Sequence, residues 1–315
     1  MGSSLMKNIL LVFKTIGIVA LSLLILVYLS LFLLLAILGR NSMDDYFEEW
    51  TAEIDTDVAF FDRRNGFVEA NGKVVDCDSI IREKYGKEWL NYSFFTVKND
   101  LIYGMVFLSG ENSEFKELID IISIDPSTNQ LTVLHSGEYI PDDIKKYEVD
   151  TYYSDGKLVI YDGTKTASYN IESGEYEIGL PTDFSYPEQE YTVEEIESET
   201  ILECGFIIKS KTEERRLTIS DMAERNEKIK ALTELETHRW LFFFTTEPLK
   251  SFIYDLQVVN NEIYLIGRVF DNDGECNAVV FRYDYDTDSF AFVFHSFSSE
   301  SPSITIIPNE SFTAK

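Results

Sequence analysis

The longest apolar stretch of the chain is Ile16–Leu38, which contains 23 consecutive residues without a charge. As an α-helix it would be about 34 Å long, and the hydrocarbon core of a bilayer is about 30 Å thick. A lone segment in lipid must be helical, because only a helix pairs all of its own backbone polar groups. The alternatives are a buried core helix and a cleaved signal peptide, whose apolar region is usually shorter. The sequence therefore predicts a retained transmembrane helix at Ile16–Leu38, with the lipid bilayer as its partner.

The distribution of charge predicts the orientation of this helix. Residues 1–40 contain three basic side chains (Lys7, Lys14 and Arg40) and no acidic one, whereas the whole chain has 27 basic and 55 acidic side chains. Subtracting the three leaves 24 basic and 55 acidic side chains, a net charge of about −31, for residues 41–315. Because positive charge is retained on the cytoplasmic side, we expect a single-pass protein of the cell membrane with its N-terminus in the cytoplasm. A domain this acidic repels phosphate, so we expect no nucleic acid partner.

The sequence predicts four segments. They are a cytoplasmic tail at 1–15, the transmembrane helix at 16–38, an acidic stalk at 39–56 and an extracytoplasmic all-β domain at 57–315. From Asp57 onward, short apolar runs alternate with turn signals, which is typical of an all-β fold. The predicted strands include Val58–Phe61, Leu101–Leu108, Ile201–Lys209 and Glu262–Val269. Type I′ hairpin turns are predicted at four Asn-Gly or Asp-Gly pairs, beginning at Asn65, Asn71, Asp155 and Asp273.

A short unit recurs within this region. Three clear copies begin at Asp125, Asn170 and Asp284, and each reads as Asp or Asn, two residues, Ser or Thr, two residues, then an apolar or aromatic residue. An Asp or Asn side chain can accept hydrogen bonds from backbone amides two residues on, so the unit predicts a tight turn between strands. Weaker copies begin at Asp62 and Asp221. The separations of 63, 45, 51 and 63 residues bracket one four-stranded propeller blade with loop insertions.

This recurring unit resembles β-propeller repeats, in which such a turn joins the two outer strands of each blade. The resemblance covers most of residues 57–297 and implies five or six blades. The Gly-His and Trp-Asp marks of WD40 repeats are missing, so no specific family follows. In a propeller, the C-terminal run Ser303–Ile307 would pair with the N-terminal strands and close the ring. A β-sandwich or another multi-sheet all-β domain is the alternative.

Two charged stretches interrupt the strand pattern. Ser79–Tyr92 and Ser220–Trp240 have apolar residues at helical spacing, so we predict helices there. In the second stretch, Ser220 or Asp221 would be the N-cap. An N-cap at Asp221 conflicts with a blade turn at the same residue, and we favour the helical insertion.

No catalytic residue, cofactor or metal ligand is predicted, because the sequence lacks the common nucleophile, zinc-binding and nucleotide-binding motifs. His135 and His295 occupy equivalent places after two of the repeat turns, which favours a structural role, and His238 is given the same interpretation. Cys77, Cys204 and Cys276 have no metal-binding spacing. One disulfide with a free thiol, or three buried small side chains, are both consistent with them.

Several acidic or Asn-containing motifs have ordinary explanations. Asp271–Glu275 resembles a calcium loop, but Val280 occupies the place where an EF-hand needs Glu, so a hairpin tip is expected. Adjacent carboxylates at Asp44-Asp45, Asp142-Asp143 and Glu194-Glu195 are expected by chance in so acidic a chain. Asn91 and Asn309 fit the glycosylation sequon, which matters only in a eukaryotic secretory route.

The sequence thus favours a membrane-anchored binding or scaffolding module with a protein or carbohydrate ligand. The alternative is an extracytoplasmic carbohydrate-active enzyme, which would need two carboxylates from different blades in one pocket. A sensor subunit is disfavoured, since a 15-residue tail is too short for a signalling domain.

Overall fold

The computed structural model divides the chain into two compact units, Met1–Trp50 and Thr51–Lys315. It describes residues 22, 25–30, 50–86, 90–108, 117–139, 150–161, 166–179, 189–234, 236–237, 240–241, 244–245, 249–250, 252–270, 276–295 and 302–311. In the first unit, residues 22 and 25–30 are helical, and Ile25–Leu29 are exposed. Within these ranges, no helix is long and apolar enough to cross a membrane. The expected tail, most of the expected span at 16–38 and the stalk up to residue 49 lie outside the described residues.

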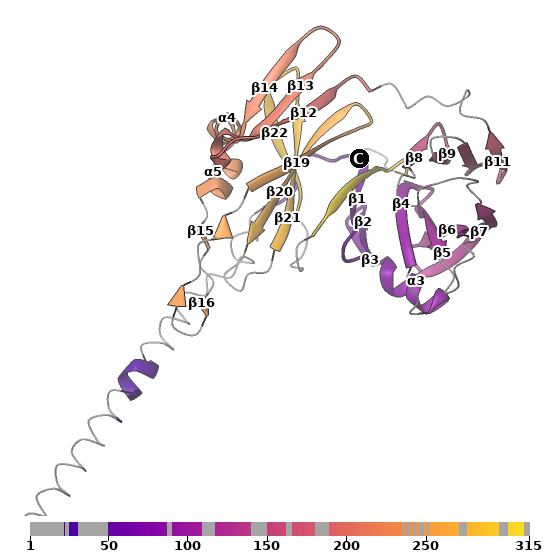
Figure 1. Cartoon of the computed structure of the whole chain (residues 1–315), viewed down its shortest axis with the longest axis horizontal. Coiled ribbons are helices and arrows are strands. Elements are labelled where there is room, and N and C mark those ends of the chain that lie inside the picture. Colours follow the sequence, from indigo (N-terminus) through magenta and orange to yellow (C-terminus); the bar gives the residue numbers. More distant parts are fainter. Residues whose placement is uncertain are drawn as a thin grey trace, which may run out of the picture. The chain divides into compact units, whose positions relative to one another are not determined.

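The second unit is an all-β domain of several antiparallel sheets, as expected (Figure 1). Four sheets have four strands each. The first has the order β23 (Ile304–Pro308), β1 (Val58–Asp62), β2 (Phe67–Ala70) and β3 (Lys73–Asp76). The second contains β4 (Leu90–Lys98), β5 (Leu101–Leu108), β6 (Glu117–Asp125) and β7 (Gln130–Tyr139). The third contains β8 (Asp150–Ser154), β9 (Lys157–Tyr161), β10 (Thr166–Asn170) and β11 (Tyr176–Gly179). The fourth contains β19 (Phe252–Val259), β20 (Glu262–Phe270), β21 (Cys276–Asp284) and β22 (Ser289–His295).

Smaller elements complete the described part of this unit. A three-stranded sheet contains β12 (Thr192–Ile196), β13 (Gly205–Lys209) and β14 (Glu214–Thr218). Two short pairs are β15 (Glu236–Thr237) with β18 (Leu249–Lys250), and β16 (Trp240–Leu241) with β17 (Phe244–Thr245). The helices are α3 (Cys77–Tyr85), α4 (Ile219–Arg225), α5 (Glu227–Glu234) and the 3₁₀ turn η2 (Ile201–Glu203).

The C-terminal strand completes the N-terminal sheet. β23 pairs with β1 along its whole length, with Val58 opposite Pro308 and Asp62 opposite Ile304. The expected pairing of Ser303–Ile307 with the N-terminal strands is therefore confirmed. The chain then continues to β4, where the backbone N–H of Glu310 donates to the carbonyl of Val97 at 2.7 Å. This strand therefore fixes the two ends of the domain to each other.

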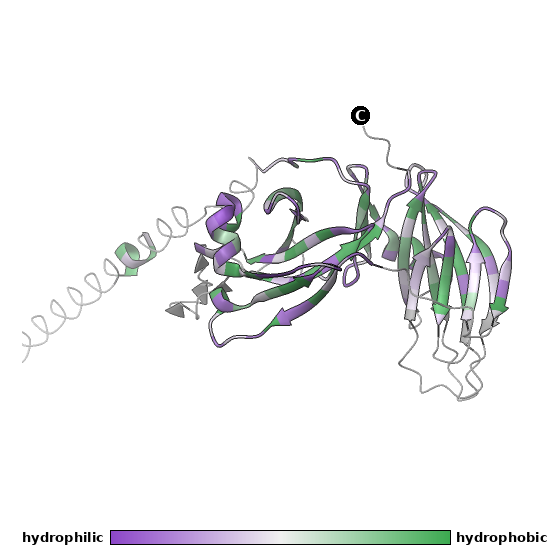
Figure 2. Cartoon of the chain, turned by 90° about the horizontal axis from the view of Figure 1, so that it is seen from above, coloured by the Kyte–Doolittle hydropathy of each residue, from purple (hydrophilic) through white to green (hydrophobic). Residues whose placement is uncertain are grey.

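Successive sheets bury both of their faces against one another. Neighbouring residues of a strand point to opposite faces, so Phe60 and Phe61 of β1 enter different clusters. The cluster around Phe60 joins the first sheet to the fourth, and the cluster around Phe61 joins the first sheet to the second. A third cluster joins the second sheet to the third through Phe95 and Leu158. This explains why β1 is buried at all five positions, and Figure 2 shows hydrophobic residues concentrated on the strands.

The three clear copies of the recurring unit form the same turn. Each joins the third and fourth strands of a four-stranded sheet, namely β6 to β7, β10 to β11 and β21 to β22. In each, a side-chain oxygen of the first residue accepts from the backbone N–H two residues on. These bonds are Ser127 to Asp125 at 2.7 Å, Glu172 to Asn170 at 2.9 Å and Asp286 to Asp284 at 2.9 Å. The fifth residue of each turn has a positive φ: Asn129 at 56°, Gly174 at 71° and Asp288 at 54°.

The two weaker copies do not mark blade turns of this kind. Asp62 makes the same local turn, with Arg64 N–H donating to its Oδ1 at 3.1 Å and φ of 74° at Gly66. That turn joins β1 to β2, which are the second and third strands of their sheet because β23 occupies the first place. Asp221 lies in α4, so a helical insertion is present, but it is shorter than predicted, because α5 ends at Glu234 and both Glu236–Thr237 and Trp240–Leu241 are strands. The N-cap is Thr218 rather than Ser220 or Asp221, and Asp221 completes its capping box.

The Asn-Gly and Asp-Gly predictions had mixed outcomes. The pairs beginning at Asn71 and Asp155 have positive φ at both residues, as a type I′ turn requires. The type I′ turn predicted at the pair beginning at Asn65 is wrong, because this pair ends the turn that Asp62 begins. The pair beginning at Asp273 lies outside the described residues. Two hairpin turns that were not predicted, 99–100 and 260–261, also have positive φ at both positions.

Two predicted elements have different limits in the structure. Ile201–Lys209 is not one strand, because Ile201–Glu203 forms η2 and β13 begins at Gly205. The helix predicted at Ser79–Tyr92 is α3, which is capped by Asp76 and followed by Gly86 at φ 87°. Only Gly tolerates that backbone conformation easily, so the helix stops there and Tyr92 belongs to β4.

Candidate ligand-binding cavity

An edge strand from each of five sheets contributes to one cavity of about 770 Å³. The strands are β23, β4, β8, β12 and β19. Cavities that bind small molecules usually have volumes of about 300–1,000 Å³. The volume and the convergence of five strands make this cavity the strongest candidate site among the described residues.

Aromatic side chains form much of the apolar lining. Phe61, Phe94 and Phe95 are buried core residues that also reach the cavity, and Tyr152 and Tyr153 of β8 are partly exposed there. Tyrosine combines a flat apolar ring with a polar tip, and it can therefore contact a ligand that has both kinds of surface.

Side-chain amides form part of the polar lining. Gln189 Nε2 donates to the carbonyl of Val258 at 3.4 Å, and Asn261 Oδ1 accepts from the N–H of Glu190 at 3.1 Å. Asn260 Nδ2 donates to a carboxylate oxygen of Asp57 at 3.2 Å. Each bond uses one of the two polar atoms of its amide group, and the bonds fix the orientation of the amides at the cavity.

The charge of the lining differs from that of the protein. Of the described residues around the cavity, Arg63 alone carries a formal charge, and none is Asp or Glu. The chain as a whole contains 55 acidic residues among 315. Acidic side chains are therefore excluded from the described lining of this site, although they dominate elsewhere.

A charged network lies beside the cavity and links three sheets. Lys98 at the end of β4 binds Glu310 at 2.9 Å and Glu172 at 3.0 Å, and the Tyr153 hydroxyl donates to Glu310 at 2.5 Å. Burial opposes ionisation of Glu310, but the hydrogen bonds from Tyr153 and Lys98 keep its pKa below the usual value. The hydrogen bonds to Glu310 and Glu172 raise the pKa of Lys98. Lys98 and Glu310 thus stay charged at neutral pH, and Glu310 holds Tyr153 in place at the cavity.

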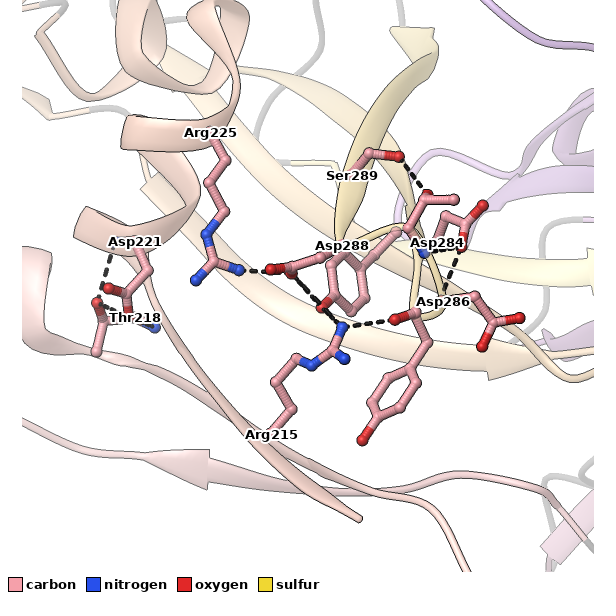
Figure 3. A network of polar contacts seen from close by, with 11 residues as sticks. Arg215, Thr218, Asp221, Arg225, Asp284, Asp286, Asp288 and Ser289 are labelled. Atoms are coloured by element: carbon pink, nitrogen blue, oxygen red, sulfur yellow. Dashed lines mark hydrogen bonds and ion pairs between the residues drawn. The ribbon is translucent and has the colours of Figure 1, made fainter. Parts of the chain in front are cut away.

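A second polar network joins the three-stranded sheet to the fourth sheet (Figure 3). Arg215 of β14 donates to the Tyr283 hydroxyl at 2.7 Å and to the Tyr285 carbonyl at 2.5 Å, and its guanidinium lies 4.1 Å from the centre of the Tyr285 ring. Arg225 of α4 pairs with Asp288 at 2.5 Å, and the Tyr283 hydroxyl donates to the same carboxylate at 2.7 Å. Burial raises the pKa of Tyr283 to about 12, so it remains a donor. These polar groups satisfy one another, which indicates a structural junction.

Of the histidines and carboxylates singled out in the sequence, those that the structure describes do not line the cavity. His135 lies within β7 and stacks on Tyr176 with ring centres 4.1 Å apart, and His295 is the last residue of β22. Glu194 of β12 pairs with Lys209 at 2.5 Å on the adjacent strand. His238, the pairs Asp44-Asp45 and Asp142-Asp143, and the loop Asp271–Glu275 lie outside the described residues.

The cysteines do not form a cluster. Cys77 and Cys204 are free thiols, and Cys276 is buried at the first residue of β21. Burial raises the pKa of Cys77, so this thiol stays protonated. Over the described part of the chain, no group of three or more His, Cys, Asp or Glu side chains could hold a metal ion.

Comparison with known proteins gives little further information. No family model matches the sequence, and no curated protein matches it. Among solved structures, the chain is similar to the extracellular domain of a proposed one-component system from B. thetaiotaomicron, with 10% sequence identity and a TM-score of 0.22. The alignment covers 78% of this chain and 34% of that one, so this chain spans about a third of the other's length.

Proposed function

We propose that residues 57–315 form a five-bladed, propeller-like domain that binds a ligand in its central cavity, and that Ile16–Leu38 anchors this domain to the outer face of the cell membrane. The observation that carries the proposal is the cavity itself, to which five sheets each contribute an edge strand. A ring of blades produces this arrangement, because the first strand of every blade faces the axis.

The connectivity supports a ring. Three of the four-stranded sheets are formed by strands consecutive in the chain, and β23 supplies the missing first strand of the sheet that contains β1–β3. Beyond β23, a bridge between Val97 and Asn309 is parallel, so the first strands of two adjacent sheets run in the same direction. Closure of this kind removes exposed sheet edges at the chain ends.

The three-stranded sheet departs from the regular pattern. Gln189, just before β12, contacts Val258 near the end of β19, whereas Ile196 at the end of β12 shares a second cavity with Ile253 near the start of β19. β12 therefore runs opposite to β19. The sheet β12–β14 then corresponds to a blade that lacks its first strand, so that its second strand, β12, faces the cavity.

The lining favours binding over glycoside hydrolysis. A glycosidase requires two carboxyl groups about 5–9.5 Å apart across the scissile bond. Among the described lining residues there is no carboxylate, while aromatic rings, amides and hydroxyls are plentiful. This composition is typical of a recognition site.

The binding site is tested by filling the cavity. Thr151 lines the cavity, whereas Thr132 is an exposed residue of β7. The full chain in non-ionic detergent micelles would be screened by thermal shift against oligosaccharides and peptides. We expect a hit to be lost in Thr151→Trp and kept in Thr132→Trp. A hit that survives in Thr151→Trp would place the binding site elsewhere.

The orientation is tested separately, by protease treatment of intact cells. An antibody against the C-terminal region should lose its band, because the acidic domain is expected outside. A band that remains until the cells are lysed would reverse the orientation.

A further inference from the structure

The charge of the cavity indicates the chemical class of its ligand. We propose that the cavity binds an acidic saccharide, with the ligand carboxylate held by Arg63. This inference rests on the proposed function, because it requires the cavity to be a binding site.

Arg63 is positioned by the backbone and has an unused guanidinium. Its backbone N–H donates to the carbonyl of Ser303 at 2.8 Å, which extends the β1–β23 ladder by one residue. Because residues two apart in a strand share a face, Arg63 projects to the same side as Phe61, and both line the cavity. In the described part of the chain, the guanidinium forms no ion pair or hydrogen bond. Its five N–H donors are therefore available to a ligand.

The neighbouring carboxylate does not neutralise Arg63. Asp62 points to the opposite side and is 6% exposed. Its oxygens accept from the N–H of Arg64 at 3.1 Å, the amide of Asn65 at 2.7 Å and the N–H of Ser303 at 3.1 Å. These donors hold the Asp62 carboxylate in the turn, so its side chain does not pair with Arg63.

The local charge decides which ligand the cavity accepts. The chain carries a formal net charge of −28, which at long range would favour cations. Physiological salt screens charges beyond about 8 Å, so inside the cavity the nearest group dominates. Arg63 is the charged residue of the described lining, whereas the carboxylates of Asp57 and Glu310 are not part of that lining and already accept hydrogen bonds from Asn260 and Tyr153. A planar guanidinium pairs with a carboxylate through two parallel hydrogen bonds.

The rest of the lining suits a sugar better than a simple anion. Tyr152 and Tyr153 line the cavity and can contact the apolar side of a pyranose, while the second polar atoms of the Gln189 and Asn261 amides can hydrogen-bond to hydroxyl groups. A ligand that uses all of these groups has both hydroxyl groups and a carboxylate, as a uronic acid oligomer has.

The experiment compares two probes that differ only at C6 of each sugar, where a carboxylate replaces a hydroxymethyl group. Tetragalacturonate and the neutral galactose tetramer with the same linkage would be titrated into the full chain in non-ionic detergent micelles and followed by calorimetry. We expect the wild type to bind the acidic probe at least tenfold more tightly, since a hydrogen bond to a charged group contributes about 10-fold to 100-fold in affinity. Arg63→Gln should remove this preference. Arg64→Gln is the matched control, because Arg64 is also exposed but does not line the cavity.

Each outcome has a defined meaning. Loss of the preference in Arg63→Gln but not in Arg64→Gln supports the inference, and so does weaker binding of only the acidic probe when salt is raised. Unchanged binding of the acidic probe by Arg63→Gln overturns it. If both probes bind equally and Thr151→Trp abolishes both, the anionic preference is wrong but the cavity remains a binding site. If the wild type binds neither probe, the saccharide inference is wrong. The proposed function is then tested separately, by the thermal-shift screen with Thr151→Trp.

Discussion

Replacing Ile306 by alanine would test whether the C-terminal strand holds the domain together. Ile306 is 4% exposed and packs with Phe60 of β1 and with Tyr264 and Ile266 of β20, between two sheets. Truncating a buried isoleucine to alanine costs about 2–5 kcal/mol, and the cost is higher where the surroundings cannot close the cavity. Its neighbours Phe60, Tyr264 and Ile266 are buried in the same cluster, so we expect a loss of about 3 kcal/mol. That is a large part of the roughly 5–15 kcal/mol that stabilises a typical domain.

The measurement is urea unfolding of the full chain in detergent micelles, followed by circular dichroism and intrinsic fluorescence. With a denaturant slope of about 3 kcal/mol/M, the unfolding midpoint should fall by about 1 M. Thr305→Val is the control, because Thr305 lies on the same strand but is only partly buried, and this change keeps the shape of the side chain. Its effect should stay within about 0.5 kcal/mol. Equal midpoints for Ile306→Ala and wild type would mean that β23 does not pack between the two sheets.

Four further predictions concern local structure, and each is checked by the same unfolding measurement. Gly205→Ala should destabilise the domain by about 2 kcal/mol or more, because the new Cβ would lie 2.0 Å from a backbone oxygen of β14. Gly179→Ala is the control and should not destabilise it, because no atom lies closer than 4.0 Å to the Cβ added there. Thr218→Ala should cost about 1 kcal/mol by removing the N-cap of α4. The hydrogen bonds from Thr218 lower the pKa of Asp221 in the folded state. The stabilisation that the Asp221 carboxylate gives is therefore fully present above its unfolded pKa of about 4 and is lost as the pH falls through its folded pKa. Asp221→Asn should make the free energy of unfolding depend less on pH in this acidic range. Arg215→Lys should cost about 1 kcal/mol, because lysine cannot keep both hydrogen bonds and the ring contact, and an unchanged midpoint would contradict the junction.

The sequence predicted local turns better than it predicted their place in a sheet. Asp125, Asn170 and Asp284 form the expected turn because its geometry depends on a few neighbouring residues. Asp62 forms the same turn, but between the second and third strands of its sheet. β1 is the second strand there because β23, about 240 residues later in the chain, pairs with its other side. Local chemistry determines the turn, and long-range pairing determines which strands it joins.

Short strands with few apolar residues were the least predictable elements. β12 (TVEEI) and β3 (KVVD) each have only one or two apolar side chains to mark a buried face. Strand residues at an edge are held by backbone pairing on one side, so their side chains carry little pattern. The apolar runs of β5 and β20, which are buried on two faces, were found because most of their residues are hydrophobic.

The cavity could not be predicted from the sequence, and Arg63 shows why. In the run Asp62-Arg63-Arg64 nothing distinguishes the two arginines, and both would be assigned to a solvated turn. The two arginines differ because the N–H of Arg63 still bonds to Ser303, which extends the pairing of β1 with β23 by one residue, so that Arg63 continues the alternation of β1. The N–H of Arg64 instead bonds to the side chain of Asp62 within the turn. The other walls of the cavity come from β4, β8, β12 and β19, each far away in the chain. The two arginine variants therefore test this difference directly: if Arg64→Gln impaired ligand binding as strongly as Arg63→Gln, the alternation that sends only Arg63 into the cavity would be wrong.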